Sequence, residues 1–201
     1  MTQGSLTDGD AALLVNAANT NINLGSGVSG AIRAACGEGY QAHIHDELRR
    51  RHGGPLEPGA VLITDAGRHP SARYVAHVAV MDYRQGFTAE SFPTMPLLVR
   101  CYVNLWEAIE EIDDTPTLSV ATVALGAGTG RIGLRDSVEA SCRTLAAHIE
   151  RAPGSRIGDV TFYGYDLLEY LVTLEVVKSH FPIDESGIPA EVRALLRSKR
   201  S

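Results

Sequence analysis

Apolar residues follow two kinds of spacing along this chain. Three segments repeat them every three to four positions, as amphipathic helices do: Val28–Cys36, Leu98–Ile112 and Val138–Ile149. Around these segments lie five short runs rich in branched apolar residues: Ala12–Val15, Ala60–Thr64, Tyr74–Val80, Leu118–Leu125 and Val160–Tyr165. Several runs are apolar at almost every position, which is typical of strands buried on both faces. The alternation predicts an α/β fold, a three-layer α/β/α sandwich with a mostly parallel central sheet.

The composition is that of an ordinary globular protein. The chain has 201 residues, of which 44% are hydrophobic and 21% charged. It contains neither an apolar run of membrane-spanning length nor a basic start followed by an apolar signal core, so we expect a cytoplasmic protein with no membrane partner. The segment Pro182–Pro189 indicates a break before a short terminal helix, Ala190–Arg197.

The charge balance argues against a nucleic-acid partner. The formal net charge is −6 at pH 7, which disfavours binding to a phosphate backbone. Compact basic features occur at Arg49–Arg51 and in the tail, at Arg193, Arg197, Lys199 and Arg200. We interpret both as solvated faces rather than binding patches.

The cysteines and histidines give no pattern for a metal or a disulfide framework. Cys36, Cys101 and Cys142 are widely spaced and form no Cys-x-x-Cys pair. We expect Cys36 and Cys142, which lie on apolar helix stripes, to be small buried hydrophobic residues. His43 and His45 point about 200° apart on a helix and cannot share a metal there. We therefore expect no metal and no cofactor.

A glycine-rich segment carries the main functional prediction. The apolar run that ends at Val15 leads into Asn16-Ala17-Ala18-Asn19, then Gly25-Ser26-Gly27-Val28-Ser29-Gly30 at the start of a helix. This order leaves backbone N–H groups free to hold an anion, at the edge of an α/β sheet where ligands collect. The glycines alone would also fit a plain turn, and the absence of Gly-Lys-Ser/Thr excludes a Walker-type loop. The segment favours a nucleotide-like ligand.

The whole string closely resembles the signature of macrodomains, a family of ADP-ribose-binding modules. The resemblance rests on Val15–Asn19 and Gly25–Ile32, and four further segments fall in the family's order: Gly59–Thr64, Ala72–His77, Gly128–Leu134 and Thr161–Asp166. It covers roughly Gly4 to Phe181. We therefore expect a macrodomain-like domain over residues 1–181 and a C-terminal extension over residues 182–201.

The resemblance implies where ADP-ribose would bind. The two glycine loops would flank the diphosphate with backbone N–H groups, Asn19 would hold the ribose distal to adenine, and Tyr165 would stack on adenine. The ligand-contacting residues it implies are Leu6, Asn19, Ser26, Gly27, Val28, Gly128, Thr129, Gly130, Arg131, Ile132 and Tyr165.

Three neighbouring polar residues have simpler structural interpretations. We favour a scaffold role for Asn16, in which the side chain pins the loop by bonding its own backbone. For Asp166 we favour the N-cap of the following helix. His77 ends a predicted central strand, and a structural, hydrogen-bonded histidine is favoured there over a catalytic one.

The chain also departs from the family pattern. Ser5 stands where many members have an acid that accepts the adenine amino group, and Asp8 or Asp10 could replace that acid only after a rearrangement of the loop. Ser29 stands where one hydrolytic branch has an aspartate, and a serine hydroxyl is far too weak a base at neutral pH. Ile132 stands where another branch has an aromatic residue that helps to position the distal ribose.

The resemblance leads to a functional hypothesis with an alternative. We expect a mono-ADP-ribosyl hydrolase that acts on ester-type linkages, with Asn19 and Ser29 as the catalytic candidates and the ligand's own phosphate helping to place a water. The alternative is a non-catalytic reader of ADP-ribose, and a pocket that has drifted to another nucleotide is a third possibility. The expected partner is ADP-ribose or an ADP-ribosylated protein. The oligomeric state is left open. The loop Asp82–Pro93 could close over a ligand, although an irregular surface connection is favoured, and the expanded segment around Arg84 to Pro96 lies outside the resemblance.

Overall fold

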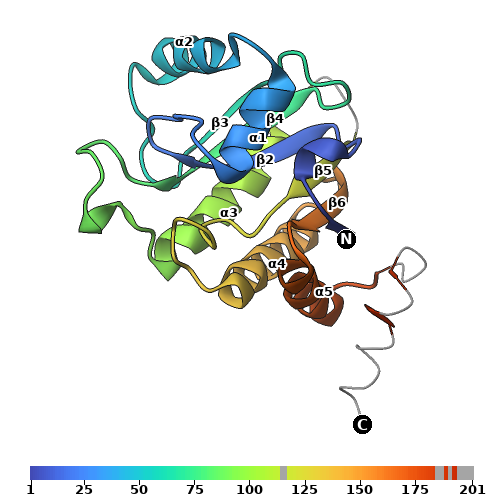
Figure 1. Cartoon of the computed structure of the whole chain (residues 1–201). Coiled ribbons are helices and arrows are strands. Elements are labelled where there is room, and N and C mark those ends of the chain that lie inside the picture. The colour runs from blue at the N-terminus through green and yellow to red at the C-terminus, as the bar shows by residue number, and fades with distance from the viewer. Residues whose placement is uncertain (114–116, 184–187, 190–191, 194–201) are drawn as a thin grey trace.

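The computed structural model describes residues 1–113, 117–183, 188–189 and 192–193 and is built around one six-stranded sheet (Figure 1). The strand order is β1-β6-β5-β2-β4-β3. All neighbouring strands are parallel except β3 and β4, which are antiparallel. The strands are β1 (Thr2–Gln3), β2 (Leu13–Asn19), β3 (Val61–Asp65), β4 (Tyr74–Met81), β5 (Leu118–Thr122) and β6 (Ile157–Gly164).

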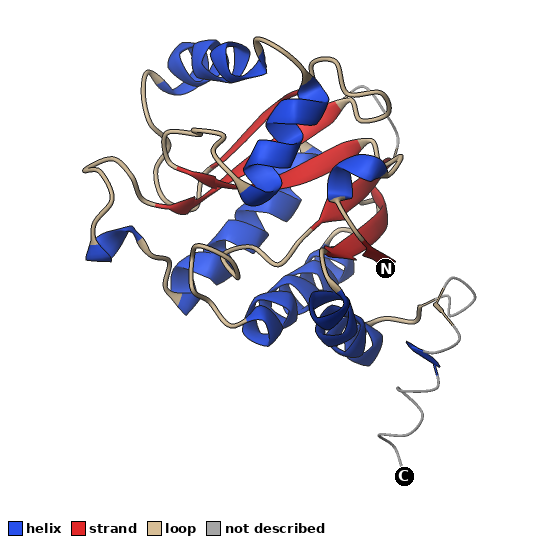
Figure 2. Cartoon of the chain, in the orientation of Figure 1, coloured by secondary structure: helices blue, strands red, loops and turns tan. Residues whose placement is uncertain are grey.

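Helices cover both faces of this sheet, which gives the three layers visible in Figure 2. The first two helices pack on one face and the last three on the other. The α-helices are α1 (Gly27–Cys36), α2 (Tyr40–His52), α3 (Met95–Glu110), α4 (Leu134–Arg151) and α5 (Leu167–His180), and short 3-10 turns occur at η1 (Leu6–Asp8) and η2 (Ala89–Ser91). The predicted α/β sandwich with a mostly parallel sheet is confirmed.

Strand β2 shows how the chain fills both layers. Successive side chains of a strand point to opposite faces. Leu13 and Val15 join the cluster under α3 and α4, and Leu14 and Ala18 join the cluster under α1 and α2. In the sheet, β2 lies between β4, with which it pairs along its whole length, and β5, with which it pairs at Leu13 and Leu14. This central position explains the apolar run and places the end of β2 in the middle of the sheet edge.

Several strands begin or end at residues other than those predicted. Strand β2 does not end at Val15 but continues through Asn19, because its polar residues stay paired with β4. The run that begins at Leu118 leaves the sheet after Thr122, and β6 begins earlier than predicted, at Ile157. Most of the expected terminal helix at 190–197 lies outside the described residues, so its presence stays a prediction.

The cysteines are buried, as the helix stripes predicted for Cys36 and Cys142. Burial raises the pKa of Cys36 to about 11 and that of Cys142 to about 12, so both remain neutral thiols at pH 7. Among the described helices, not one combines the length and the apolar character that crossing a bilayer would require.

Candidate functional site

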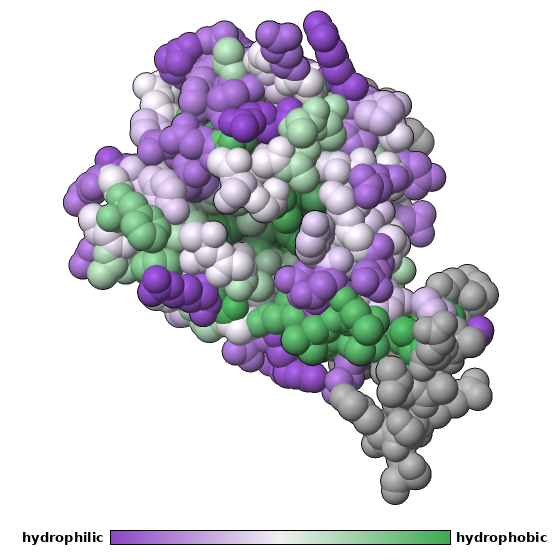
Figure 3. Space-filling view, viewed as in Figure 1, coloured by the Kyte–Doolittle hydropathy of each residue, from purple (hydrophilic) through white to green (hydrophobic). Residues whose placement is uncertain are grey.

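A pocket opens at the carboxyl ends of the parallel strands. Its volume is about 570 Å³, within the range of small-molecule sites. Figure 3 shows this face hollowed, with apolar side chains in the hollow. The residues that line the pocket come from four regions: Gly4–Leu6; Ala17 with Ser26–Ser29 and Ala31; Val80, Met81, Val123, Ala124, Gly126–Gly130 and Leu134; and Tyr163, Tyr165 and Glu169.

The first glycine-rich turn forms one wall at the start of α1. Gly27 has a φ of +57°, which favours glycine, and a Cβ on Gly30 would lie 2.9 Å from the Gly25 carbonyl oxygen. Ser26 is the N-cap of α1 but makes no capping bond with its side chain. The first N–H groups of a helix have no partner within it. The turn therefore presents open backbone donors to the pocket.

The second glycine-rich turn forms the opposite wall, between β5 and α4. Gly126 has a φ of +74°, and a Cβ on Gly130 would lie 2.6 Å from the Gly126 carbonyl oxygen. The N–H groups of Arg131 and Ile132 bond back to the carbonyl oxygens of Gly128 and Gly126, at 3.1 and 3.0 Å. Three consecutive N–H groups in this described turn bond to no carbonyl, those of 128, 129 and 130. Both turns can thus donate to one anion between them.

The charge of the pocket is unusual for an anion site. Of the residues that line it, Glu169 alone carries a charged side chain. An anion bound between the two turns would be held by backbone dipoles rather than by lysine or arginine.

A buried polar network lies behind the first turn. The Ser29 hydroxyl donates to Asn16 Oδ1 at 2.8 Å, and Asn16 Nδ2 donates to His77 Nδ1 at 3.1 Å. Asn16 and His77 are both fully buried. Because Asn16 presents its oxygen to Ser29, its amide nitrogen faces the imidazole and makes His77 Nδ1 an acceptor. The prediction that Asn16 pins the loop by bonding its own backbone is wrong: its partners are the side chains of Ser29 and His77, and its role is structural through them.

The other imidazole nitrogen completes this network. His77 Nε2 lies 3.2 Å from Thr64 Oγ1 and 3.4 Å from the Tyr40 hydroxyl, and these two oxygens are 3.0 Å apart. Burial, together with the nearby His43, lowers the pKa of His77 to about 3, so the ring is neutral. His77 is therefore the structural, hydrogen-bonded histidine that the sequence predicted.

Asn19 pins the loop that follows β2. Its Oδ1 accepts from the backbone N–H groups of Asn21 and Asn23 at 3.1 and 3.2 Å, and its Nδ2 donates to the Asn23 carbonyl at 3.1 Å. This is the backbone-pinning role that the sequence analysis gave to Asn16. Asn19 is not among the residues that line the pocket. Its contact with a distal ribose remains a prediction.

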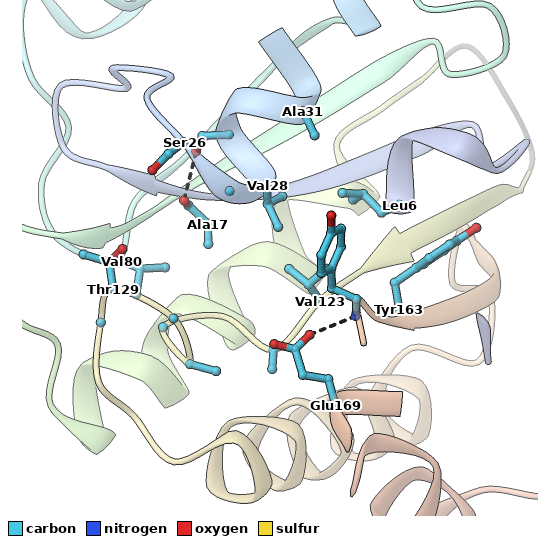
Figure 4. A pocket seen from close by; sticks show the side chains of 18 of the residues that line it. Leu6, Ala17, Ser26, Val28, Ala31, Val80, Val123, Thr129, Tyr163 and Glu169 are labelled. Atoms are coloured by element: carbon cyan, nitrogen blue, oxygen red, sulfur yellow. Dashed lines mark hydrogen bonds between the residues drawn. The ribbon is translucent and has the colours of Figure 1, made fainter. Parts of the chain in front are cut away.

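Tyr165, the residue predicted to stack on adenine, lies at the far end of the pocket. The Tyr165 side chain is 76% exposed, beside Leu6, which is buried. Figure 4 shows Leu6 and Tyr163 on one side of the pocket, with Ser26, Val80 and Thr129 on the other. The end with Leu6 and Tyr163 therefore lies apart from the end that the two turns form.

The start of α5 contributes one residue that the sequence analysis missed. Asp166 Oδ1 accepts from the backbone N–H of Glu169 at 2.8 Å, which confirms Asp166 as the N-cap. Glu169 in turn accepts the backbone N–H of Tyr165 at 2.8 Å (Figure 4). The sequence did contain an indication of this role: Glu169 is an acid three positions after the N-cap Asp166 and four positions after the candidate aromatic residue Tyr165.

Two predicted ligand contacts lie outside the lining of the pocket. The Arg131 guanidinium stacks over the Phe92 ring at 4.2 Å, and Ile132 packs next to Gly126. Phe92 belongs to an aromatic cluster with Tyr83 and Phe87 in the loop after β4. No residue of the Asp82–Pro93 loop lines the pocket. Closure of this loop over a ligand stays a prediction.

The histidines of α2 have separate partners. His43 Nε2 lies 2.7 Å from Asp65 Oδ2, and His45 Nε2 lies 2.9 Å from Gln41 Nε2. Within the described ranges, no three metal-ligating side chains are arranged to hold an ion. The basic run at the end of α2 is paired with acids of the same helix, Asp46 and Glu47.

Comparison with known proteins identifies the family. The Macro domain family model matches residues 15–141. The chain is 29% identical to an O-acetyl-ADP-ribose deacetylase of Cronobacter turicensis, over 85% of this chain and 90% of that protein. It is 31% identical to an uncharacterized protein of Pyrobaculum aerophilum, over 90% and 91% of the two chains. The protein belongs to the Macro domain family.

Solved structures share the fold. A macrodomain mutant of Oceanobacillus iheyensis with ADP-ribose superimposes with a TM-score of 0.71 at 22% identity, over 88% of this chain and 90% of that one. A Trypanosoma brucei macrodomain in complex with ADP-ribose gives a TM-score of 0.71 at 22% identity, over 87% and 67% of the two chains.

Proposed function

We propose that this protein binds ADP-ribose in the pocket between the two turns and hydrolyses ester-type mono-ADP-ribose derivatives. The observation that carries the proposal is that two turns line one space of about 570 Å³, one at a helix start without a side-chain cap and the other with three backbone N–H groups that bond to no carbonyl. A diphosphate is the anion that two separate sets of donors suit. The O-acetyl-ADP-ribose deacetylase among the relatives supports an ester as the bond that is broken.

The pocket favours one orientation of the ligand. The diphosphate would lie between Gly27 and Gly128, with the adenine against Tyr165 and Leu6 at the far end. The distal ribose would then extend past Ser26 and Thr129 toward Asn19. Each of these residues except Asn19 lines the pocket.

The chemistry of hydrolysis would depend on orientation rather than on a strong base. Neither histidine nor cysteine lines the pocket, and the Ser29 proton is donated to Asn16. The ligand's own phosphate and the backbone dipoles would have to hold a water against the reacting carbon. We expect slow turnover.

The same observations favour a second candidate function, a reader that binds ADP-ribose without turnover. The Asn19 amide makes three hydrogen bonds within its own loop, and Ser29 is turned toward the buried network. Neither candidate catalytic side chain is therefore held ready for a substrate.

Binding is tested with Gly128→Val. A Cβ at Gly128 meets open space, and its φ is not in the left-handed region, so valine fits the backbone while its side chain enters the pocket. We expect an ADP-ribose Kd raised on the order of 100-fold, because the side chain blocks the diphosphate. Gly154→Val is the matched control, since Gly154 has equal clearance but lies away from the pocket. Calorimetry that finds equal affinities for the two variants would contradict the proposed pocket.

Turnover separates the two candidate functions. The assay follows free ADP-ribose released from a glutamate-linked mono-ADP-ribosylated protein. If the protein is a hydrolase, the wild type releases more ADP-ribose than Asn19→Ala and Gly128→Val do. If it is a reader, the wild type binds ADP-ribose and releases none from the substrate. A folded wild-type protein that ignores millimolar ADP-ribose would overturn both candidates.

A further inference from the structure

The far end of the pocket has the chemistry of a base-recognition site. Tyr165 offers an exposed aromatic face, and the apolar side chains of Leu6 and Val123 also line the pocket. A planar base stacks on such a ring through dispersion and π density, without regard to its identity. Discrimination between bases would need a fixed hydrogen-bonding group beside the ring.

Glu169 is such a group. Its carboxylate accepts the backbone N–H of Tyr165 at 2.8 Å, so it is anchored to the residue whose ring would stack on the base. One carboxylate oxygen makes that bond, and the other has no hydrogen-bond partner in the described part of the chain. Figure 4 shows the side chain rising from α5 to the pocket. An ionised carboxylate can only accept hydrogen bonds, so where a stacked base displaces water from its second oxygen, that oxygen needs a donor from the base.

The other acids near this end do not reach the pocket. Asp8 and Asp10 do not line it, and the Ser5 hydroxyl is engaged with Thr7 Oγ1 at 2.7 Å. Glu169 is thus the carboxylate available to a base that lies on Tyr165.

We infer that Glu169 determines base specificity by accepting a hydrogen bond from the exocyclic amino group of a purine stacked on Tyr165. A base that carries a carbonyl at the same position would place two acceptors against each other and bind more weakly. The inference rests on the proposed function, because the purine is the adenine of ADP-ribose.

The test compares ADP-ribose with inosine diphosphate ribose, in which a carbonyl replaces the amino group. Glu169→Gln keeps an oxygen for the Tyr165 N–H and turns a donor toward the ligand. We expect the wild type to prefer ADP-ribose by about tenfold and Glu169→Gln to prefer the inosine ligand. Glu175→Gln, on the same helix but outside the pocket, is the matched control and should behave as the wild type.

Calorimetry with both ligands distinguishes the outcomes, and thermal melting checks that each variant is folded. Equal wild-type affinities would overturn the inference while leaving ADP-ribose binding intact. An equal loss of both ligands in Glu169→Gln would also overturn it, because Glu169 would then contact a shared group such as a ribose hydroxyl. If the wild type binds neither ligand, the proposed function fails and the inference falls with it.

Discussion

The two faces of the sheet are filled in different ways. Under α3 and α4, large apolar side chains dominate, among them Leu105 and Trp106, and both are fully buried. Under α1 and α2, the apolar cluster is interrupted by the fully buried Asn16 and His77, which connect to Ser29 at the pocket wall. Under α3 and α4, the Tyr102 hydroxyl accepts from the Leu125 backbone N–H at 2.9 Å, at the α3 side of the second turn. The Asn16–His77 pair instead lies within the sheet and connects it to the first turn through Ser29.

The difference has a thermodynamic meaning. Apolar packing is non-directional and roughly proportional to the area removed from water. A buried hydrogen-bond network requires every member to be satisfied, since an unpaired polar group costs about 1–3 kcal/mol. We therefore expect substitutions on the first face away from the pocket, such as at Trp106, to change mainly stability, and substitutions in the Asn16–His77 network to change both stability and the pocket.

The largest expected effect is that of Trp106→Ala. The indole is fully buried, and its Nε1 donates to Thr144 Oγ1 at 3.0 Å. We expect the free energy of unfolding to fall by about 3–5 kcal/mol through cavity formation. Urea denaturation measures this loss, and calorimetry on the folded variant should give an ADP-ribose Kd within about twofold of the wild type. A much larger change in affinity would show that the apolar face also shapes the site.

A smaller effect is expected from pH, through His77. Its pKa falls from the model-peptide value of 6.5 to about 3 on folding, so the unfolded chain binds the proton between these two values. The contribution of the neutral His77 ring to the free energy of unfolding is therefore fully present above pH 6.5 and is lost as the pH falls toward 3. We expect a loss of about 2 kcal/mol between pH 7.5 and 5.

The control for this pH dependence is His77→Gln, which cannot titrate. Urea midpoints of both proteins across the same pH range isolate the contribution of the one imidazole, because the other histidines are common to both. Parallel pH profiles for the two proteins would disprove the neutral, buried state of His77.

The smallest expected effect is that of Ser29→Ala. Loss of the hydroxyl leaves Asn16 Oδ1 without its 2.8 Å donor, and we expect a cost of about 1–2 kcal/mol. Ser141→Ala is the matched control, since that hydroxyl is also buried but makes no hydrogen bond of ordinary length and angle with a described residue. If both variants lose equal stability in denaturation experiments, the network contributes nothing beyond burial of a small side chain.

The sequence predicted the layers and the two turns because these depend on local patterns. Apolar periodicity identified the buried strands, and glycines at the sheet edge identified the turns that line the pocket. The antiparallel edge strand β3 was not foreseen, because strand direction at an edge depends on which neighbour it pairs with and not on its own composition.

The two asparagines show the limit of this reasoning. Both lie in β2, and their roles depend on which face of the strand each side chain points to. Asn16 points into the layer under α1 and bonds His77, 61 positions away, whereas Asn19 reaches the loop four residues ahead. The end of β2 was placed too early, so alternation could not be applied to either residue. Glu169 was missed for a different reason: an acid in the first turn of a helix is usually solvated, so its sequence position did not indicate a place in the pocket.

The construction of the two turns has a consequence for how this site tolerates mutation. Every amino acid except proline carries the main-chain N–H on which the turns depend. Gly128 and Thr129 can therefore each be substituted without loss of the backbone donor, provided that the new side chain leaves the cavity open. Only positions such as Gly27 and Gly130, fixed by a left-handed φ or by a carbonyl at 2.6 Å, are held to one residue. A saturation library of these turns should accept side chains that leave the cavity open, should lose binding where a larger side chain enters it, as with valine at Gly128, and should lose the fold of the turns at the restricted glycines.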